Sequence, residues 1–331
     1  MAPLLPGRRR ILGAAMLACL PIRATAQPDL SRPLGPTIAD TGSAWYRFSR
    51  FTLGSVDGQR SYRITLGVPL RPPPRQGYPA IVLLDGNAAL AAIDEPQLQA
   101  LQEGSPPVIV AVGYDTALRF DVAARAYDYT PPIPAGQVDD ETSRGRRGGG
   151  ATVFLDLLQD RILPQVRQQV ALDATQLSLW GHSYGGLFVL HTLFTRPGLF
   201  SRYIAASPSL WWQGGVILQE EQGFPGAPGA RLWLMAGEAE RRERMPAEAD
   251  DARTRAVLAA RAAIPPQALP ELAERLRDRH GLAVQWQSFP GLAHGPMLPA
   301  SLGPALRIAA GLAPWPGLYP HVSQSKSAPG G

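Results

Sequence analysis

The stretch that most constrains the fold is Leu177–Leu190, with the sequence LSLWGHSYGGLFVL. An apolar segment leads through Gly181–Gly185 (GHSYG) into a second apolar segment. This is G-x-S-x-G between an expected buried strand and an expected helix, the context in which the motif presents a reactive serine. Glycines two residues before and after Ser183 let neighbouring backbone pass close to a strained turn. The pattern predicts Ser183 as a nucleophile, and a simple glycine turn is the alternative interpretation.

Residues 1–26 have the features of an export signal. Arg8–Arg10 precede a short apolar run, Ile11–Leu20, and Ala24–Ala26 form an A-x-A site. A charged start, a short apolar core and a small-residue site are typical of a cleaved signal, and the run is too short to remain as a membrane span. The Arg-Arg order also fits a twin-arginine signal. We therefore expect a periplasmic or secreted protein; a lipoprotein attached through Cys19 is the alternative.

Loss of this segment changes the charge of the chain. The 331 residues carry a formal net charge of +5, and residues 1–26 hold four arginines and no acid, so the mature chain is left at +1. So small a charge gives no reason to expect a nucleic-acid partner or stable membrane insertion. Cys19 is the single cysteine, and it leaves with the signal, which excludes a disulfide or a cysteine metal site in the mature chain.

Strand-like and helical patterns alternate along the rest of the chain. We expect a poorly ordered lead over 27–44, one domain over 45–312 and a tail over 313–331. Two runs at the start of the domain, Trp45–Leu53 and Ser61–Pro69, predict an antiparallel hairpin. Buried strands are expected at Ala80–Leu84, Val108–Gly113, Gln176–Trp180, Tyr203–Ser207, Leu232–Gly237 and Val284–Phe289, and helices at Thr152–Gln169, Leu187–Thr195 and Gln267–Arg279. The alternation predicts an α/β fold with a mostly parallel, doubly wound sheet.

A nucleophilic serine needs a general base and an acid that orients the base, and this fold places them in the order Ser, Asp/Glu, His. Of the five histidines, only His294 follows the last expected strand on a loop, so it is the predicted base. The strand ending at Gly237 is followed by two glutamates. The spacing favours Glu240 as the acid, with Glu238 the alternative; both would instead be solvated if they began a charged helix.

The predicted chemistry also needs donors for an oxyanion. The Tyr184 N–H, in the first turn of the expected helix, is one candidate. The second is the backbone N–H of Asn87, after the strand that ends at Leu84, with Gly86 allowing a close approach. Acyl transfer by these groups needs neither a metal nor an organic cofactor.

The chain resembles the putative-esterase family of α/β-hydrolases, and within it the siderophore esterases that cut catecholate triesters such as enterobactin and salmochelin. The residues that carry the resemblance are Leu83–Gly86, Arg125–Pro131, Gly148–Ala151, the Ser183 motif, Ser207–Trp212 and Gly291–His294. The resemblance implies an α/β-hydrolase fold and places Arg125, Trp211 and Trp212 at the substrate pocket. From the residues alone, a structural salt bridge to Asp128 or a neighbour and simple ring packing remain the alternatives.

Two segments depart from the family pattern and predict lid-like insertions, Gly214–Gly229 and Arg241–Pro266. The functional prediction is an exported serine esterase that hydrolyses small carboxylic esters, of siderophore type, through an acyl-enzyme. One alternative is a polysaccharide-linked feruloyl or acetyl esterase, or an acyltransferase, on the same machinery. Another is a catalytically silent relative that binds a ligand.

Overall fold

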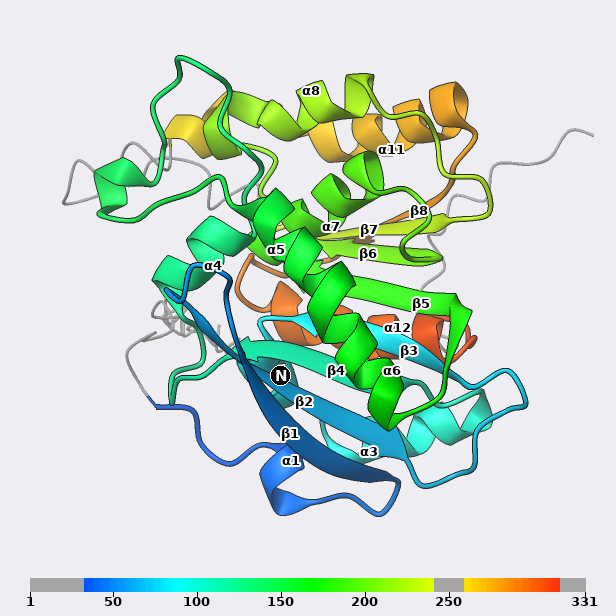
Figure 1. Ribbon diagram of the computed structural model, residues 1–331. Helices are drawn as coiled ribbons and strands as arrows, with labels where there is room; N and C mark the ends of the chain where they lie inside the picture. Colours follow the sequence, from blue (N-terminus) through cyan, green and yellow to red (C-terminus); the bar gives the residue numbers. More distant parts are fainter. Residues whose placement is uncertain (1–32, 241–258, 316–331) are drawn as a thin grey trace, which may run out of the picture.

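An eight-stranded sheet with helices on both faces forms the centre of the computed structural model, which describes residues 33–240 and 259–315 (Figure 1). The order across the sheet is β1-β2-β4-β3-β5-β6-β7-β8. The strands are β1 Tyr46–Gly54, β2 Ser61–Pro69, β3 Tyr78–Leu84, β4 Val108–Tyr114, β5 Leu172–His182, β6 Arg202–Ala206, β7 Arg231–Gly237 and β8 Ala283–Phe289.

The strand directions divide the sheet into two parts. From β4 through β3 and β5 to β8 all neighbours are parallel, whereas β1 pairs with β2 and β2 pairs with β4 antiparallel. Every residue of β3 and β4 is buried, as expected for strands covered on both faces. The predicted α/β-hydrolase fold, with its antiparallel start, is confirmed.

Helices cover the two faces of the sheet. The longer described elements are α2 Gly86–Leu90, α3 Glu95–Ala100, α4 Val122–Asp128, α5 Ala151–Leu157, α6 Leu163–Gln169, α7 Tyr184–Thr195, α8 Val216–Gln222, α11 Ala268–His280 and α12 Met297–Ala309. Figure 1 shows α5 and α6 crossing in front of the sheet and α12 behind it. Alternate strand residues belong to two cores: Leu84 is part of the core that includes residues of α5, α7 and α11, and Leu83 is part of the core that includes residues of α3 and α12.

One expected helix, Thr152–Gln169, is interrupted. A single π turn, Leu158–Ile162, lies between α5 and α6. Pro164 occupies the first turn of α6 and has no N–H to donate to the carbonyl four residues earlier. A π turn next to such a proline is a common way to keep the two helical pieces continuous.

The lead before β1 is more ordered than expected. From residue 33 onward it is described: α1 (Ile38–Thr41) is closed by a capping box in which Thr37 and Asp40 bond each other reciprocally. The Leu34 N–H donates to the Ala117 carbonyl at 2.7 Å. The Leu34 bond anchors the segment to the loop after β4, and no local pattern of apolar residues marks either contact.

The two segments expected as lids have different outcomes. Gly214–Gly229 contains α8, and its Ile217 and Phe224 are buried in the core, so this part is a packed layer of the domain. Of Arg241–Pro266, residues 241–258 lie outside the described residues, as do the expected signal, residues 1–26, and residues 316–331 of the tail. Within the ranges that the structure describes, none of the helices has both the length and the apolar content to span a membrane.

Candidate active site

Ser183 lies at a sharp turn between β5 and α7. Its φ of 61° and ψ of −116° are unusual for a residue with a side chain. A Cβ at Gly181 would lie 2.4 Å from the Gly185 backbone, so glycine is required there. Gly185 has room for a Cβ, whereas one at Gly186 would lie 2.7 Å from the Ala206 carbonyl oxygen. The second tight approach is therefore one residue later than the sequence motif suggested.

Three predicted residues form one hydrogen-bonded chain. The Ser183 Oγ is 3.0 Å from His294 Nε2, and His294 Nδ1 is 3.0 Å from Glu240 Oε2. Because a carboxylate only accepts, Nδ1 carries the proton and Nε2 is free to accept from the Ser183 hydroxyl. The three side chains follow β5, β7 and β8, whose carboxyl ends share one edge of the sheet.

The geometry separates the two candidate acids. Glu240 is buried, and its Oε1 accepts from the Ser207 hydroxyl at 2.6 Å and the Gly237 N–H at 2.8 Å. Burial, the largest effect, raises the pKa of Glu240, but the hydrogen bonds and charge of His294, with those two donors, outweigh it and hold the pKa below its usual value. Glu238 is exposed, and the one hydrogen bond that its carboxylate accepts among the described residues comes from the Ser288 hydroxyl, at 3.4 Å. Glu240 is the glutamate that reaches His294.

His182, the residue before Ser183 in the motif, contacts the loop that carries His294. Its Nε2 is 2.9 Å from the carbonyl oxygen of His294, to which it donates, and the two rings lie 4.7 Å apart. Burial, with the neighbouring His294, lowers the pKa of His182 well below its usual value, so it stays neutral. His182 thus fixes the loop that carries the predicted base, a contact between residues 112 positions apart.

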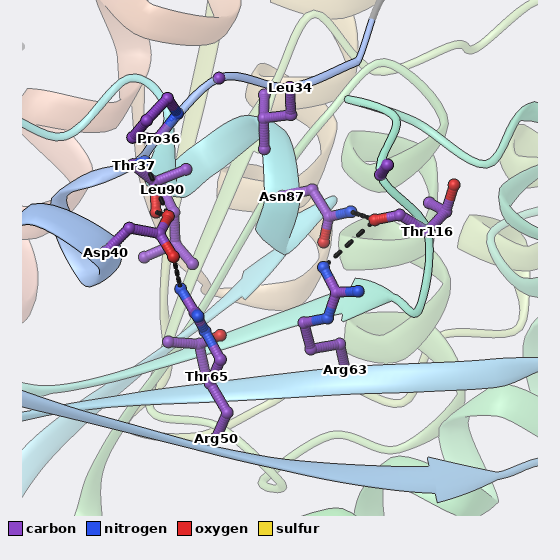
Figure 2. Close-up of a pocket in the computed structure, with 12 residues that line it drawn as sticks. Leu34, Pro36, Thr37, Asp40, Arg50, Arg63, Thr65, Asn87, Leu90 and Thr116 are labelled. Atoms are coloured by element: carbon purple, nitrogen blue, oxygen red, sulfur yellow. Dashed lines mark hydrogen bonds and ion pairs between the residues drawn. The ribbon is translucent and has the colours of Figure 1, made fainter.

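The expected oxyanion loop is held against β4 and the loop that follows it. A Cβ at Gly86 would lie 2.7 Å from the Ala111 and Gly113 backbone, which explains the close approach to β4. The Asn87 amide donates to the carbonyls of Tyr114, Thr116 and Leu118 at 3.0–3.3 Å, and Figure 2 shows its bond to Thr116. The side chain thus binds the neighbouring loop. The Asn87 and Tyr184 N–H groups lie in the first turns of α2 and α7, where helices leave N–H groups without internal acceptors.

Arg125 makes a structural salt bridge, which was the alternative to a place at the substrate pocket. Its partner is Asp85 and not Asp128. Its Nε and Nη2 each lie 2.8 Å from an Asp85 oxygen, a bidentate pair, and the Arg125 side chain is 14% exposed. Burial alone would lower the pKa of Arg125, but Asp85 more than compensates and raises it. Asp128 instead pairs with Arg60 at 3.0 Å. The Arg125 pair fixes Asp85, the residue that precedes the expected oxyanion loop.

The two tryptophans differ. Trp212 is fully buried, its Nε1 has no partner among the described residues, and a Cβ at Gly148 would lie 2.9 Å from its ring. That is the position of a core side chain, which corrects the expectation that Trp212 borders the pocket. Trp211 is 9% exposed, and the guanidinium groups of Arg144 and Arg261 each lie 5.3 Å from its ring centre.

Glu141, which no sequence pattern singled out, is a further buried carboxylate beside the turn. It accepts from the Tyr184 hydroxyl at 2.6 Å and pairs with Arg144 and Arg146. Burial, followed by this carboxylate, raises the pKa of Tyr184. The pairing ties the loop around Thr142–Arg144 to the residue that follows Ser183.

A cavity of about 450 Å³ lies beside Asn87, walled by the lead, the hairpin and the loop after β4 (Figure 2). Its arginines are already paired, Arg50 with Asp40 and Arg63 with Asp115, both at 2.6 Å. None of the three residues of the Ser183 chain lines it. No cluster of three or more His, Cys, Asp or Glu side chains suited to a metal occurs in the part of the chain that the structure describes.

Comparisons with known proteins agree with the resemblance expected from the sequence. A family model described as Putative esterase matches residues 55–287. The apo-salmochelin esterase of Escherichia coli O6:H1 is 40% identical over 297 residues, covering 88% of this chain and 88% of that protein. The ferri-bacillibactin esterase BesA of Bacillus subtilis is 32% identical, covering 78% and 87%. The solved structure of enterobactin hydrolase IroE with DFP is 37% identical with a TM-score of 0.65, covering 83% of this chain and 100% of that one.

Proposed function

Because this chain belongs to the Putative esterase family, we propose that it is an exported serine esterase acting on siderophore-type carboxylic esters. The observation that carries the proposal is the chain of hydrogen bonds from Ser183 through His294 to Glu240, with both links at 3.0 Å. A hydroxyl, an imidazole and a buried carboxylate in this order are the groups that acyl transfer through serine requires.

In the first step His294 Nε2 takes the Ser183 proton while Ser183 Oγ attacks the ester carbonyl. The carbonyl oxygen becomes an oxyanion, for which the Asn87 and Tyr184 N–H groups are the donors; one such donor is typically worth about 10²–10³ in rate. Glu240 stabilises the imidazolium that forms. The tetrahedral intermediate collapses, the bond to the alcohol oxygen breaks, and His294 returns its proton to that oxygen. The products are the free alcohol and an ester on Ser183.

In the second step His294 removes a proton from water, which attacks the acyl-enzyme carbonyl. The intermediate collapses to the carboxylic acid, and His294 gives the proton to Ser183 Oγ, which restores the enzyme. His182 remains a neutral donor to the His294 carbonyl during both steps, since its low pKa keeps it from competing for the proton.

The siderophore substrate class is supported by the relatives, whose names record action on salmochelin and bacillibactin. Catecholates are aromatic and acidic, and arginine with tryptophan recognises such groups. Asp85 takes Nε and Nη2 of Arg125, so a substrate anion would meet Nη1. Trp211, which has two guanidinium groups 5.3 Å from its ring centre, is the proposed aromatic surface for such a group.

The test is hydrolysis of iron-free and ferric enterobactin beside short p-nitrophenyl esters, by wild type and Ser183→Ala. We expect wild type to cut the triester far faster than the generic ester, and the variant to cut neither. Cleavage of generic esters alone would remove the siderophore assignment, and feruloylated or acetylated polysaccharide would be tried next. Equal inertness of a folded wild type and variant would reject the esterase and favour a ligand-binding relative.

Export belongs to the same proposal and is supported by the sequence of residues 1–26 alone. Fractionation of expressing cells, followed by N-terminal sequencing of the mature chain, tests it. We expect a periplasmic or secreted protein beginning near Gln27. A full-length chain confined to the cytoplasm would contradict export without touching the chemistry.

A further inference from the structure

The turn Ser207–Ser209 follows β6, which lies between the strands that carry the nucleophile and the acid. In the sheet, Ala206 pairs with His182 of β5 on one side and with Met235 of β7 on the other. Parallel strands end at a common edge, so the residues after β6 lie between the loops after β5 and β7. The turn is therefore placed to contact Ser183 and Glu240 together.

Ser207 is fixed to the acid. Its φ of 45° is held by a hydrogen bond from its N–H to the Met235 carbonyl at 2.6 Å, and its Oγ donates to Glu240 Oε1 at 2.6 Å. The other carboxylate oxygen accepts from His294. A carboxylate bonded at both oxygens cannot rotate freely, so Ser207, together with the Gly237 N–H on the same oxygen, sets the direction in which Glu240 meets the imidazole.

Ser209 is fixed to the nucleophile. Its N–H donates to the Ser183 carbonyl at 3.2 Å, and its Oγ is 3.3 Å from Ser183 Oγ. Because the Ser183 hydroxyl donates to His294, the Ser209 hydroxyl is the donor between the two serines. At 3.3 Å this bond is weaker than that to His294, so its effect falls on the orientation of Ser183 Oγ. Ser209 is 1% exposed, which shields the contact from water.

We propose that Ser207 and Ser209 are positioning residues of the esterase reaction, one fixing the acid and the other the nucleophile through a single turn. The proposal rests on the proposed function. Pro208 joins the two serines with a restricted backbone, and the turn packs tightly on α7, where a Cβ at Gly186 would lie 3.1 Å from the Pro208 Cα. A shift of the turn would displace both ends of the hydrogen-bonded chain.

The test compares Ser207→Ala and Ser209→Ala with Ser178→Ala, a matched control. Ser178 is fully buried on β5, and its hydroxyl has no partner among the described residues. With a p-nitrophenyl ester, we expect kcat to fall several-fold to about tenfold in each turn variant, with KM nearly unchanged, and no change in the control. In a Glu240→Gln background, Ser207→Ala should have little further effect, because Ser207 acts through that carboxylate.

Two further readouts separate positioning from loss of structure. Ser207→Ala should move the NMR signal of the His294 Nδ1 proton, whereas Ser209→Ala should leave it in place and slow labelling of Ser183 by a fluorophosphonate. Wild-type kcat, labelling rate and proton signal in both variants would overturn the inference while the esterase stands. If wild type neither hydrolyses nor labels, the proposed function fails, and an unmoved proton signal in Ser207→Ala would then overturn the positioning role as well.

Discussion

The two parts of the sheet contribute differently to the site. The half from β5 to β8, which is wholly parallel, is the parallel half; it supplies Ser183, Glu240 and His294, each from the loop after a strand. The half from β1 to β4, in which the antiparallel β1 and β2 adjoin the parallel β4 and β3, is the mixed half; it supplies the proposed oxyanion loop, after β3, and the bidentate Asp85–Arg125 pair. The hydrogen-bonded chain of Ser183, His294 and Glu240 thus comes wholly from the parallel half, and the buried Asp85–Arg125 pair comes from the mixed half. The comparison predicts that damage to one half stops the chemistry, whereas damage to the other misplaces the substrate and weakens the fold.

The largest effect should come from the acid in the parallel half. Glu240→Gln removes the acceptor that fixes the His294 tautomer, and kcat should fall by about 10⁴ with the fold intact. Glu238→Gln is the matched control, two residues away and exposed, and should keep wild-type kcat. Steady-state hydrolysis of a p-nitrophenyl ester measures both. Equal losses in the two variants would contradict the assignment of the acid.

The ion pair tests the mixed half. Arg125→Met leaves Asp85, whose side chain is 2% exposed, buried without its partner, so the free energy of unfolding should fall by about 3–5 kcal/mol. Because the proposed oxyanion loop directly follows Asp85, kcat/KM should also fall, by about 10²–10³. Denaturant unfolding and ester hydrolysis are the measurements.

The matched control for this pair is Arg63→Met, whose ion pair with Asp115 is 34% and 42% exposed and should be worth at most about 1 kcal/mol. A double variant, Asp85→Leu with Arg125→Met, should regain stability without regaining activity. Recovery of both would assign Arg125 to the fold alone.

The glycines at the turn provide a smaller test. Gly186→Ala drives a Cβ to within 2.7 Å of the Ala206 carbonyl and should lower the free energy of unfolding by about 1–3 kcal/mol. In Gly185→Ala the new Cβ lies 3.5 Å from its nearest neighbour, so the free energy of unfolding should change by less than about 1 kcal/mol. Denaturant unfolding midpoints of the two variants are the measurement. A larger loss of stability in Gly185→Ala than in Gly186→Ala would contradict the tight approach at Gly186.

The smallest effect concerns acid stability. The pKa of folded Glu240 lies below its unfolded value of 4.5, so its carboxylate contributes stability that is present above pH 4.5 and is lost as pH falls through the folded pKa. Glu240→Gln has no such contribution. Unfolding from about pH 6 to about pH 3 should therefore show wild type losing stability faster than the variant below pH 4.5. Parallel curves would contradict the lowered pKa.

Prediction from the sequence succeeded where information was local. Apolar runs marked every strand of the parallel part, and the G-x-S-x-G motif marked the turn at Ser183. Contacts between distant residues were not predictable in the same way. Arg125 finds Asp85 40 positions away, and His182 reaches the His294 carbonyl 112 positions away. Trp212 packs close to Gly148, a neighbour that no periodicity identifies.

The glutamates after β7 show the same limit at short range. Glu238 and Glu240 are only two residues apart in the same loop. Glu240 is the buried one, and it accepts hydrogen bonds from the Ser207 hydroxyl and the Gly237 N–H. The lead has no apolar period, yet in its described part the Leu34 N–H bonds the loop after β4 and a capping box at Thr37 closes α1. In both cases the structure depends on hydrogen bonds, which a pattern of apolar and polar residues does not predict.

The most direct test of the central claim is to treat the protein with a fluorophosphonate and to locate the added mass by peptide mass spectrometry. A serine activated by a neighbouring base is the group that such reagents label. We expect a single adduct on the peptide that contains Ser183, abolished by Ser183→Ala and strongly slowed by Glu240→Gln. A folded wild type without an adduct at Ser183, or with its adduct on another residue, would contradict the account.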